Sequence, residues 1–304
     1  MLSLTEPDVR AVLRWDELIP AMERALIEFS SGHVVQPMRH VLTLEEDKRY
    51  FLSMPAATQH AMGLKAVTVY PANEGTDMPT HTAMILLFDP ATGEPLAAMD
   101  ARLITEMRTA AVSAALTNRL ASRKSRILAL LGSGVQAKAH LEALQHIRDF
   151  QEVRVHSPTP AHQEAFARAY GAKAMDAESA VRGADVIVTA TTSTQPILMG
   201  NWLKPGAHVN AIGAPRPTWR ELDDEAMQNK IIADSQEAVA QEAGDVILSK
   251  AKIYAEAGEI LSGAKQISTD ETTIFKSVGL AAEDIVAAKL VYDRIQANRE
   301  HPPA

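Results

Sequence analysis

A glycine-rich turn is the first feature of this 304-residue sequence whose residue types point to chemistry. Gly132, Gly134 and Ala137 form a GxGxxA pattern in ALLGSGVQAKAH, directly after an apolar run and directly before an amphipathic one. In such a turn the first glycine allows a tight bend, the second lets the backbone approach a pyrophosphate, and the small third residue lets the helix pack on the strand. Glycines also simply end strands, but with both flanks fitting, the pattern predicts a dinucleotide site.

The residues about 20 positions further along bear on which dinucleotide is bound, because an acid there would bond the ribose hydroxyls of NAD. No acid occurs between Val153 and Gln163. His156, Ser157 and Thr159 stand there instead, and their side chains suit a 2′-phosphate, although they also fit an ordinary polar turn. The pattern favours NADPH and leaves NADH open.

A lysine stands on an apolar face of an expected strand. Alternation along GLKAVTVYP puts Lys65 on the same face as Val67 and Val69. Lys65 either reaches solvent from the start of the strand or is buried, in which case its pKa would fall and it could serve as a proton donor.

An arginine stands where the sequence places the start of a helix. Arg108 is expected in the first turn of a helix that begins near Thr105, where a cation opposes the helix dipole. A helix N-terminus with a guanidinium is a strong site for a carboxylate, and a salt bridge with Asp100 or Glu106 is the structural alternative. Arg39, at the start of RHVLTL, is a weaker candidate of the same kind.

The elements that must position these residues form two groups. The first third predicts two helices followed by short runs typical of an antiparallel or mixed sheet, at 5–13, 15–29, 39–44, 49–55, 63–71, 80–89 and 95–101. A helix over 104–122 leads into alternating strands and helices, at 127–132, 135–147, 152–157, 160–171, 185–191, 207–213, 230–235 and 236–248. This alternation predicts an α/β fold with a Rossmann-type doubly wound parallel sheet beside an α+β domain, and a last helix over 280–297.

Composition excludes several classes of protein. The chain is 46% hydrophobic and 22% charged, which is typical of a folded globular protein, and its length favours two domains. It contains no cysteine, which excludes disulfides and thiolate chemistry and fits a reducing cytoplasm. The net charge of −8 with scattered Lys and Arg argues against nucleic acid, no run reaches about 18 apolar residues as a membrane span would, and no histidine pair suggests a metal.

Six motifs in order make nearly the whole chain resemble the ornithine cyclodeaminase and mu-crystallin family. They are QPMRHVL, FLSMPA, GLKAVTVYP, MDARLITEMRTAAVSA, LGSGVQA and TIFKSVGLAAEDIVAAKLVYD. Two further segments, NAIGAPRPTWRELDDEAM and DSQEAVAQEAGDVILS, are most similar to the mu-crystallin, or ketimine reductase, branch. The resemblance implies a substrate-binding and dimerisation domain over 1–117, a Rossmann domain over 118–280, a C-terminal helix over 281–304 that returns to the first domain, and an active site between the domains.

The resemblance also implies roles for single residues. Arg39, Lys65 and Arg108 match the family residues that hold the substrate carboxylate, and Lys65 lies where the reacting nitrogen or oxygen is polarised. The positions that match the pyrophosphate turn are Gly132, Ser133, Gly134, Val135 and Gln136. The positions that match the nicotinamide pocket are Thr189, Ala190, Thr191, Ser277 and Gly279.

Two departures from the family pattern bear on the reaction. Leu52 and Pro215 stand where ornithine cyclodeaminases carry acids that serve the two amino groups of the substrate. Neither can match a cation, so cyclodeamination of a diamino acid is disfavoured, and loss of the second acid also weighs against alanine dehydrogenase activity. The segment SPT replaces the Asn-Arg-Thr or Ser-Arg-Thr of the family, which weakens the family argument for NADP.

A cyclic ketimine carboxylate needs one anion clamp, a hydride face and a proton source. We therefore expect NAD(P)H-dependent reduction of Δ1-pyrroline-2-carboxylate or Δ1-piperideine-2-carboxylate to L-proline or L-pipecolate. Arg39 and Arg108 would hold the carboxylate, Lys65 would serve the nitrogen, and Leu52 would pack on the ring. The family resemblance implies that the protein is a homodimer. Two alternatives stay open: an amino-acid dehydrogenase or cyclodeaminase, and a non-catalytic binder of a small hydrophobic carboxylate such as an iodothyronine.

Overall fold

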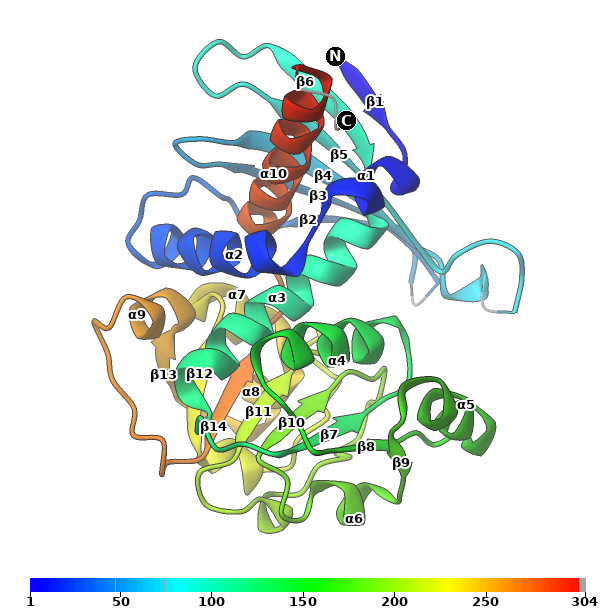
Figure 1. Cartoon of the computed structure of the whole chain (residues 1–304), viewed down its shortest axis with the longest axis vertical. Coiled ribbons are helices and arrows are strands. Elements are labelled where there is room, and N and C mark those ends of the chain that lie inside the picture. The colour runs from blue at the N-terminus through cyan, green and yellow to red at the C-terminus, as the bar shows by residue number, and fades with distance from the viewer. Residues whose placement is uncertain (47, 74, 301–304) are drawn as a thin grey trace. The chain divides into compact units, whose positions relative to one another are not determined.

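The computed structural model describes residues 1–46, 48–73 and 75–300, and divides into two compact units (Figure 1). Unit 1 comprises Met1–Arg108 and Leu280–Ala304, and unit 2 comprises Thr109–Gly279. Helix α3 (Arg102–Leu120) crosses the boundary between them. The domain bounds implied by the resemblance, and the functions assigned to the domains, stay predictions.

Unit 1 is built on a mixed sheet, one of the two kinds that the sequence predicted, and its strand order is β1-β6-β5-β4-β3-β2. Its strands are β1 (Leu2–Leu4), β2 (His40–Glu45), β3 (Arg49–Ala57), β4 (Met62–Val69), β5 (His81–Phe88) and β6 (Pro95–Asp100). Strand β1, which the sequence did not predict, runs parallel to β6, and every other neighbouring pair is antiparallel.

The helices of unit 1 cover one face of that sheet. They are α1 (Glu6–Val12), α2 (Trp15–Ser30) and α10 (Ala281–Glu300), together with the start of α3. Helix α10 lies along β3, β4 and β5 and packs against α2 (Figure 1). Alternation in β5 explains the covered face, because Ile85 and Leu87 point toward it and are fully buried.

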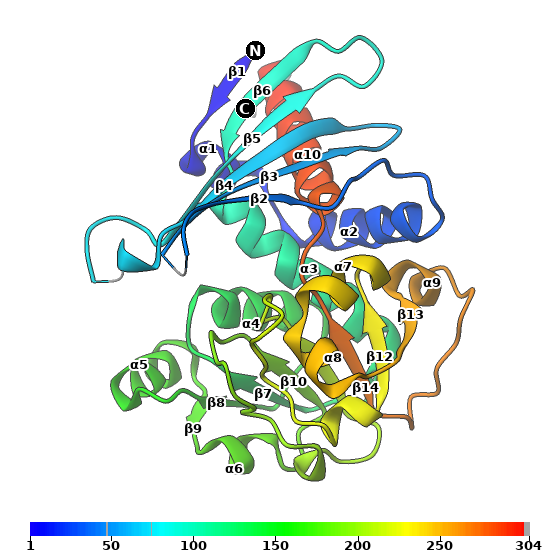
Figure 2. The same cartoon turned by 180° about the vertical axis from the view of Figure 1, so that it is seen from behind.

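The opposite face of the same sheet carries apolar side chains that remain exposed. Leu42, Phe51, Met84 and Leu86 share this face by strand register, and each is at least 37% exposed. Seen from behind, no helix of the described residues lies over these strands (Figure 2).

Unit 2 is built on a parallel sheet with the strand order β13-β12-β14-β11-β10-β7-β8-β9, which confirms the predicted doubly wound fold. Its strands are β7 (Ile127–Leu131), β8 (Glu152–His156), β9 (Lys173–Ala174), β10 (Val186–Thr189), β11 (His208–Ala211), β12 (Lys230–Ala233), β13 (Ile253–Glu256) and β14 (Thr273–Lys276). Strands β10, β11 and β14 are buried at every position, as expected of strands covered on both faces.

Short helices connect these strands. They are α4 (Val135–Ile147), α5 (Pro160–Tyr170), α6 (Ala177–Val181), α7 (Gln236–Glu242), α8 (Gly244–Ser249) and α9 (Ala257–Leu261). Because the strands are parallel, their carboxyl ends share one edge of the sheet, here called the carboxyl edge, where ligands of such folds bind. Among the described residues, no helix has the length and apolarity that crossing a bilayer requires.

Candidate functional site

Unit 1 contains a buried ion cluster around Lys65. This lysine lies in β4 between Met54 of β3 and Ile85 of β5, on the face that α10 covers, and is 2% exposed. The alternative of a lysine that reaches solvent is therefore wrong. A buried ammonium needs charged or polar partners, because desolvation of an unpaired charge is costly.

Those partners come from the first turn of α10 and from α3. The Nζ of Lys65 lies 2.5 Å from Oδ2 of Asp284. Arg108 donates from Nε to Oδ1 of Asp284 at 2.9 Å and from Nη1 to Oε2 of Glu283 at 2.5 Å. Lys65, Arg108, Glu283 and Asp284 are all buried, and one carboxylate, that of Asp284, bridges the two cations.

The environment lowers the pKa of Lys65 to about 8. Burial is the main cause, and the nearby charges of Arg108 and Arg39 act in the same direction, whereas the charge and hydrogen bond of Asp284 oppose them. At neutral pH Lys65 is still mostly an ammonium, yet it gives up its proton far more readily than an ordinary lysine. This combination suits a general acid.

The predicted setting of Arg108 at a helix start is wrong. Helix α3 begins at Arg102, so Arg108 lies in its second turn, beyond the region where the dipole acts strongly. Asp100, considered as a partner, pairs instead with Arg102, whose Nε lies 3.1 Å from Oδ2. The carboxylate affinity of Arg108 therefore rests on its guanidinium and not on the helix end.

Arg39 belongs to the same neighbourhood. It precedes β2, is half-buried, and lies close enough for its charge to lower the pKa of Lys65. Gln36, just before it, accepts a hydrogen bond from the backbone N–H of Ala282 at 2.8 Å, which ties this segment to the start of α10. The structure thus brings together all three residues predicted to hold a substrate carboxylate.

Sequence reasoning missed the two acids of the ion cluster. Glu283 and Asp284 are adjacent acids in the first turn of a helix. The helix dipole favours acids at this position, so their presence there does not by itself indicate an ion cluster. A sequence signal for their role was lacking, because Asp284 lies 176 residues away from Arg108 along the chain.

In unit 2 the glycine turn has the backbone that its sequence predicted. Gly132 follows β7 with φ +123°, and a Cβ there would meet the carbonyl oxygen of Ala190, so only glycine fits. Gly134 is the N-cap of α4, and a Cβ added to it would meet open space. The space next to Gly134 is therefore open, as the predicted approach of a pyrophosphate to this backbone requires.

The residues at the start of α4 fit a dinucleotide. Its first turn carries no acid, so its N-terminal backbone N–H groups and dipole favour an anion. Ser133 is half-buried in the turn, and Val135 is an apolar side chain left 61% exposed at the helix start. Oε1 of Gln136 is buried without a hydrogen-bond partner among the residues the structure describes.

The end of β8 lies next to the glycine turn, since the carbonyl of His156 accepts a hydrogen bond from the N–H of Gly132 at 2.9 Å. Nδ1 of His156 lies 3.2 Å from the carbonyl oxygen of Met175, and Ser157 is buried. Thr159 is the exposed N-cap of α5, and its side chain makes no capping hydrogen bond. These three residues carry hydrogen-bond donors and no carboxylate, and a 2′-phosphate would require both properties of its binding site.

The end of β10 is organised by a buried acid that the sequence did not reveal. Glu221 accepts hydrogen bonds from the hydroxyls of Thr189 and Thr191 and from the N–H of Thr191, each at 2.7 Å. Full burial raises the pKa of Glu221. The side chains of both threonines are thus committed to the protein, while Ala190 borders Gly132 through its carbonyl.

A second buried acid organises the end of β14. Oδ2 of Asp234 accepts hydrogen bonds from the hydroxyl of Ser277 at 2.8 Å and from the N–H groups of Val278 at 2.8 Å and Gly279 at 2.7 Å. Gly279 has φ +82°, which fits a glycine.

A buried lysine supports the same edge. Lys276 pairs with Asp245 at 2.8 Å and also donates to the carbonyl of Gly213. The predicted cofactor residues lie at or just after the ends of β7, β8, β10 and β14, which places them all along the carboxyl edge of one sheet.

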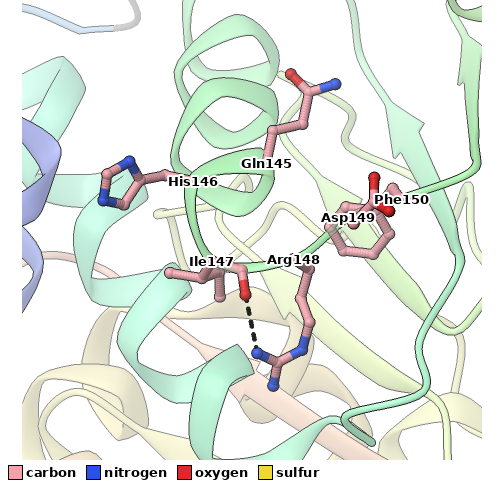
Figure 3. Close-up of a pocket in the computed structure, with 6 residues that line it drawn as sticks. All are labelled: Gln145, His146, Ile147, Arg148, Asp149 and Phe150. Atoms are coloured by element: carbon pink, nitrogen blue, oxygen red, sulfur yellow. Dashed lines mark hydrogen bonds between the residues drawn. The ribbon is translucent and has the colours of Figure 1, made fainter.

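A pocket at the other end of α4 has a different character. Figure 3 shows it lined by Gln145, His146, Ile147, Arg148, Asp149 and Phe150. Thirteen residues of helix, about 20 Å, separate it from the glycine turn. Nη1 of Arg148 bonds the carbonyl of Ile147 at 3.0 Å and Oδ1 of Asn118 at 2.8 Å, so this arginine ties α4 to α3.

Comparison with known proteins places these sites in a family. The model of the ornithine cyclodeaminase/mu-crystallin family matches residues 1–299. Ketimine reductase mu-crystallin of Mus musculus is 48% identical over 285 residues, which cover 91% of each chain.

Two solved structures are similar over almost the whole length. Δ1-pyrroline-2-carboxylate reductase of Thermococcus litoralis, in complex with NADH and L-proline, is 34% identical with a TM-score of 0.92, over 98% of each chain. An archaeal alanine dehydrogenase dimer with bound NAD is also 34% identical with a TM-score of 0.92, over 98% of this chain and 97% of that one.

Proposed function

The chain belongs to the ornithine cyclodeaminase/mu-crystallin family, and from this premise we propose that it reduces a cyclic ketimine carboxylate with NAD(P)H. The substrate would be Δ1-pyrroline-2-carboxylate or Δ1-piperideine-2-carboxylate, and the product L-proline or L-pipecolate. The observation that carries the proposal is the buried Lys65 with its pKa lowered to about 8, next to two arginines. The names of the mouse and Thermococcus relatives support the same reaction class.

The residues of unit 1 bind and protonate the imine. Arg108 and Arg39 hold the carboxylate by charge-assisted hydrogen bonds, and Arg108 does so while its Nε and Nη1 also donate to Asp284 and Glu283. The Nζ of Lys65 donates a proton to the imine nitrogen, becomes a neutral amine, and regains a proton from water after turnover. NAD(P)H, when bound, would supply the hydride for the imine carbon.

The residues of unit 2 hold the dinucleotide. The backbone N–H groups after Gly132 and at the start of α4 would bind its pyrophosphate. Asp234 and Glu221 fix the ends of β14 and β10, where Gly279 and Thr191 would form walls of the nicotinamide pocket. His156, Ser157 and Thr159, with no acid among them, favour NADPH, and NADH remains a possible donor.

Leu52 and Pro215 argue against the oxidative reactions of the family. Leu52 lies in β3 opposite Val67, and Pro215 follows β11 in an exposed position. Neither side chain can accept a proton from an α-amino group or pair with a distal ammonium. A substrate without either group, such as a cyclic imine, leaves no charge unmatched at these positions.

The exposed sheet face of unit 1 supports a homodimer. An apolar face formed by Leu42, Phe51, Met84 and Leu86 would be stabilised by burial against a second copy. Sedimentation velocity should give twice the chain mass of 32.9 kDa, and Met84→Asp should give the monomer.

Met78→Asp, which changes a side chain that is 61% exposed elsewhere, is the control and should leave the dimer intact. A wild-type monomer would overturn the proposal. A cytoplasmic location, expected from the sequence, stays a prediction.

The first experiment is an assay of the purified protein with each of the two imines. Oxidation of NADPH and of NADH is followed separately at a wavelength where only the reduced forms absorb. Turnover identifies the reaction class, the donor and the preferred ring. If neither imine reacts with either donor while alanine, ornithine or lysine reduces NAD+ or NADP+, the chain is an oxidative enzyme of the same family. Tight binding of a carboxylate without any turnover would instead indicate a binding protein.

A further inference from the structure

We propose that Asp284 is a positioning residue for the proposed reduction. Its carboxylate keeps Lys65 in the ammonium form, orients its Nζ, and fixes the position of that Nζ relative to Arg108. The inference rests on the proposed function. Asp284 does not itself touch the substrate in this scheme, because both of its oxygens are directed to the two cations.

The geometry favours this role over that of a general structural ion pair. Asp284 is fully buried, and its two oxygens contact two different cations, Nζ of Lys65 at 2.5 Å and Nε of Arg108 at 2.9 Å. One rigid carboxylate therefore sets the spacing between the group that would protonate the imine nitrogen and the group that would bind its carboxylate. In a cyclic ketimine carboxylate these two substrate groups are joined through one ring carbon, so their spacing is equally fixed.

The electrostatics make Asp284 the counter-charge of Lys65. The charged groups that face Lys65 are Asp284 of α10, Arg108 of α3 and Arg39 before β2, and Glu283 joins through Arg108. Burial and the charges of the two arginines favour the neutral amine of Lys65, and Asp284 opposes them. Without this carboxylate, Lys65 would lose its proton at a lower pH and would have no proton to donate near neutrality.

The same helix offers a matched control. Asp293 also pairs with a lysine of α10, Lys289, at 2.6 Å, but this pair is open to solvent. Exposed pairs of this kind contribute little, so Asp293→Asn makes the same chemical change without touching the ion cluster.

The test compares Asp284→Asn with Asp293→Asn in the full-length enzyme. For Asp284→Asn we expect kcat for imine reduction to fall at least about 100-fold, KM to change less than kcat, and the alkaline limb of the kcat profile to move down by at least about one pH unit. Asp293→Asn should match the wild type in all three. An Asp284→Asn enzyme with kcat within three-fold of wild type and an unmoved alkaline limb would overturn the proposal.

Two further measurements keep the proposal testable. If Asp284→Asn does not fold, Asp284→Glu can be used, because it keeps the negative charge but moves it. The alkaline limb of the kcat profile should then stay within about half a pH unit of wild type, while kcat falls at least about 10-fold. An unchanged kcat would contradict the positioning role.

If the wild type reduces neither imine, the proposed function fails first. The Nζ of Lys65 can then be titrated directly by 15N NMR, with Lys65→Met used for assignment. A pKa of Lys65 that is the same in wild type and Asp284→Asn would overturn the assignment of Asp284 independently of activity.

Discussion

The ion cluster of unit 1 and the glycine turn of unit 2 are built on opposite principles. In the ion cluster the chemistry belongs to side chains from β4, α3 and α10, buried together and matched in charge. In the turn it belongs to the backbone: Gly132 permits the tight bend beside Ala190, and Gly134 leaves open space next to the backbone at the start of α4. One site depends on long-range pairing and the other on local conformation.

This difference decides how each site should respond to change. A backbone site loses function when a Cβ is added, and the outcome follows from φ and from the nearest atoms. An ion cluster loses function when one charge is removed, and the outcome follows from what the removed charge had balanced. Predictions for both units follow in order of decreasing effect, and those on Lys65 and on the two glycines test this distinction.

Lys65→Met removes the proton donor but keeps the apolar stem of the side chain. We expect kcat for imine reduction to fall about 1000-fold, equivalent to about 4 kcal/mol in the barrier, while NADPH affinity stays within a few-fold. Steady-state kinetics and a fluorescence titration of NADPH measure the two separately. Activity that persists within a few-fold of wild type would show that the ion cluster does not carry the chemistry.

Acid should destabilise unit 2 through two buried histidines. Burial lowers the pKa of both His140 and His208 to about 4, below the unfolded value near 6.5. Each neutral histidine therefore contributes roughly 3 kcal/mol to the free energy of unfolding above pH 6.5. This contribution falls as the pH drops below 6.5 and is lost near pH 4.

Urea unfolding at pH 7.5 and pH 5 measures this loss. In His140→Gln, which removes one of the two groups, the loss should be about half as large, whereas His60→Gln, at an exposed site in unit 1, should leave it unchanged. An equal pH dependence in wild type and His140→Gln would contradict the prediction.

Gly132→Ala and Gly134→Ala should separate folding from cofactor binding in the turn. At Gly132 the new Cβ meets Ala190 at φ +123°, so we expect cofactor affinity to fall about 100-fold and stability to fall by about 1–3 kcal/mol. At Gly134 the Cβ enters open space at φ −86°, so affinity should fall while stability stays within about 0.5 kcal/mol. Calorimetric titration and thermal melting report the two effects, and two variants with equal melting temperatures would refute this reading of the turn.

His156→Asp should change cofactor preference by the smallest amount. A carboxylate at the end of β8 can bond ribose hydroxyls and repels a 2′-phosphate. We expect the ratio of kcat/KM for NADPH to that for NADH to fall about 10-fold, with His162→Asp on the exposed side of α5 as the control. An unchanged ratio would place the 2′-phosphate contact elsewhere.

The features that the sequence predicted depend on local conformation, and those that it missed depend on contacts between distant parts of the chain. The glycine turn, the sheet class and the apolar strands β7 and β10 were predictable because each depends on near neighbours in the chain. Strand β14 was not predicted, since TIFK is short and half polar, although it pairs with both β11 and β12 in the middle of the sheet. The start of α3 was placed at Thr105 and not Arg102, which changed the setting assigned to Arg108.

The sequence by itself determined the α/β class, the two-part organisation, the dinucleotide turn and the identity of three candidate cations, because composition, periodicity and local turn geometry are written in consecutive residues. Only the tertiary structure decided that Lys65 is buried and that Asp284 and Glu283 neutralise the cations of the ion cluster. It also decided that Asp234 and Glu221 fix the ends of β14 and β10. The physical reason is that charge pairing and desolvation depend on distance in space, and the partners here lie from tens to more than two hundred residues apart along the chain.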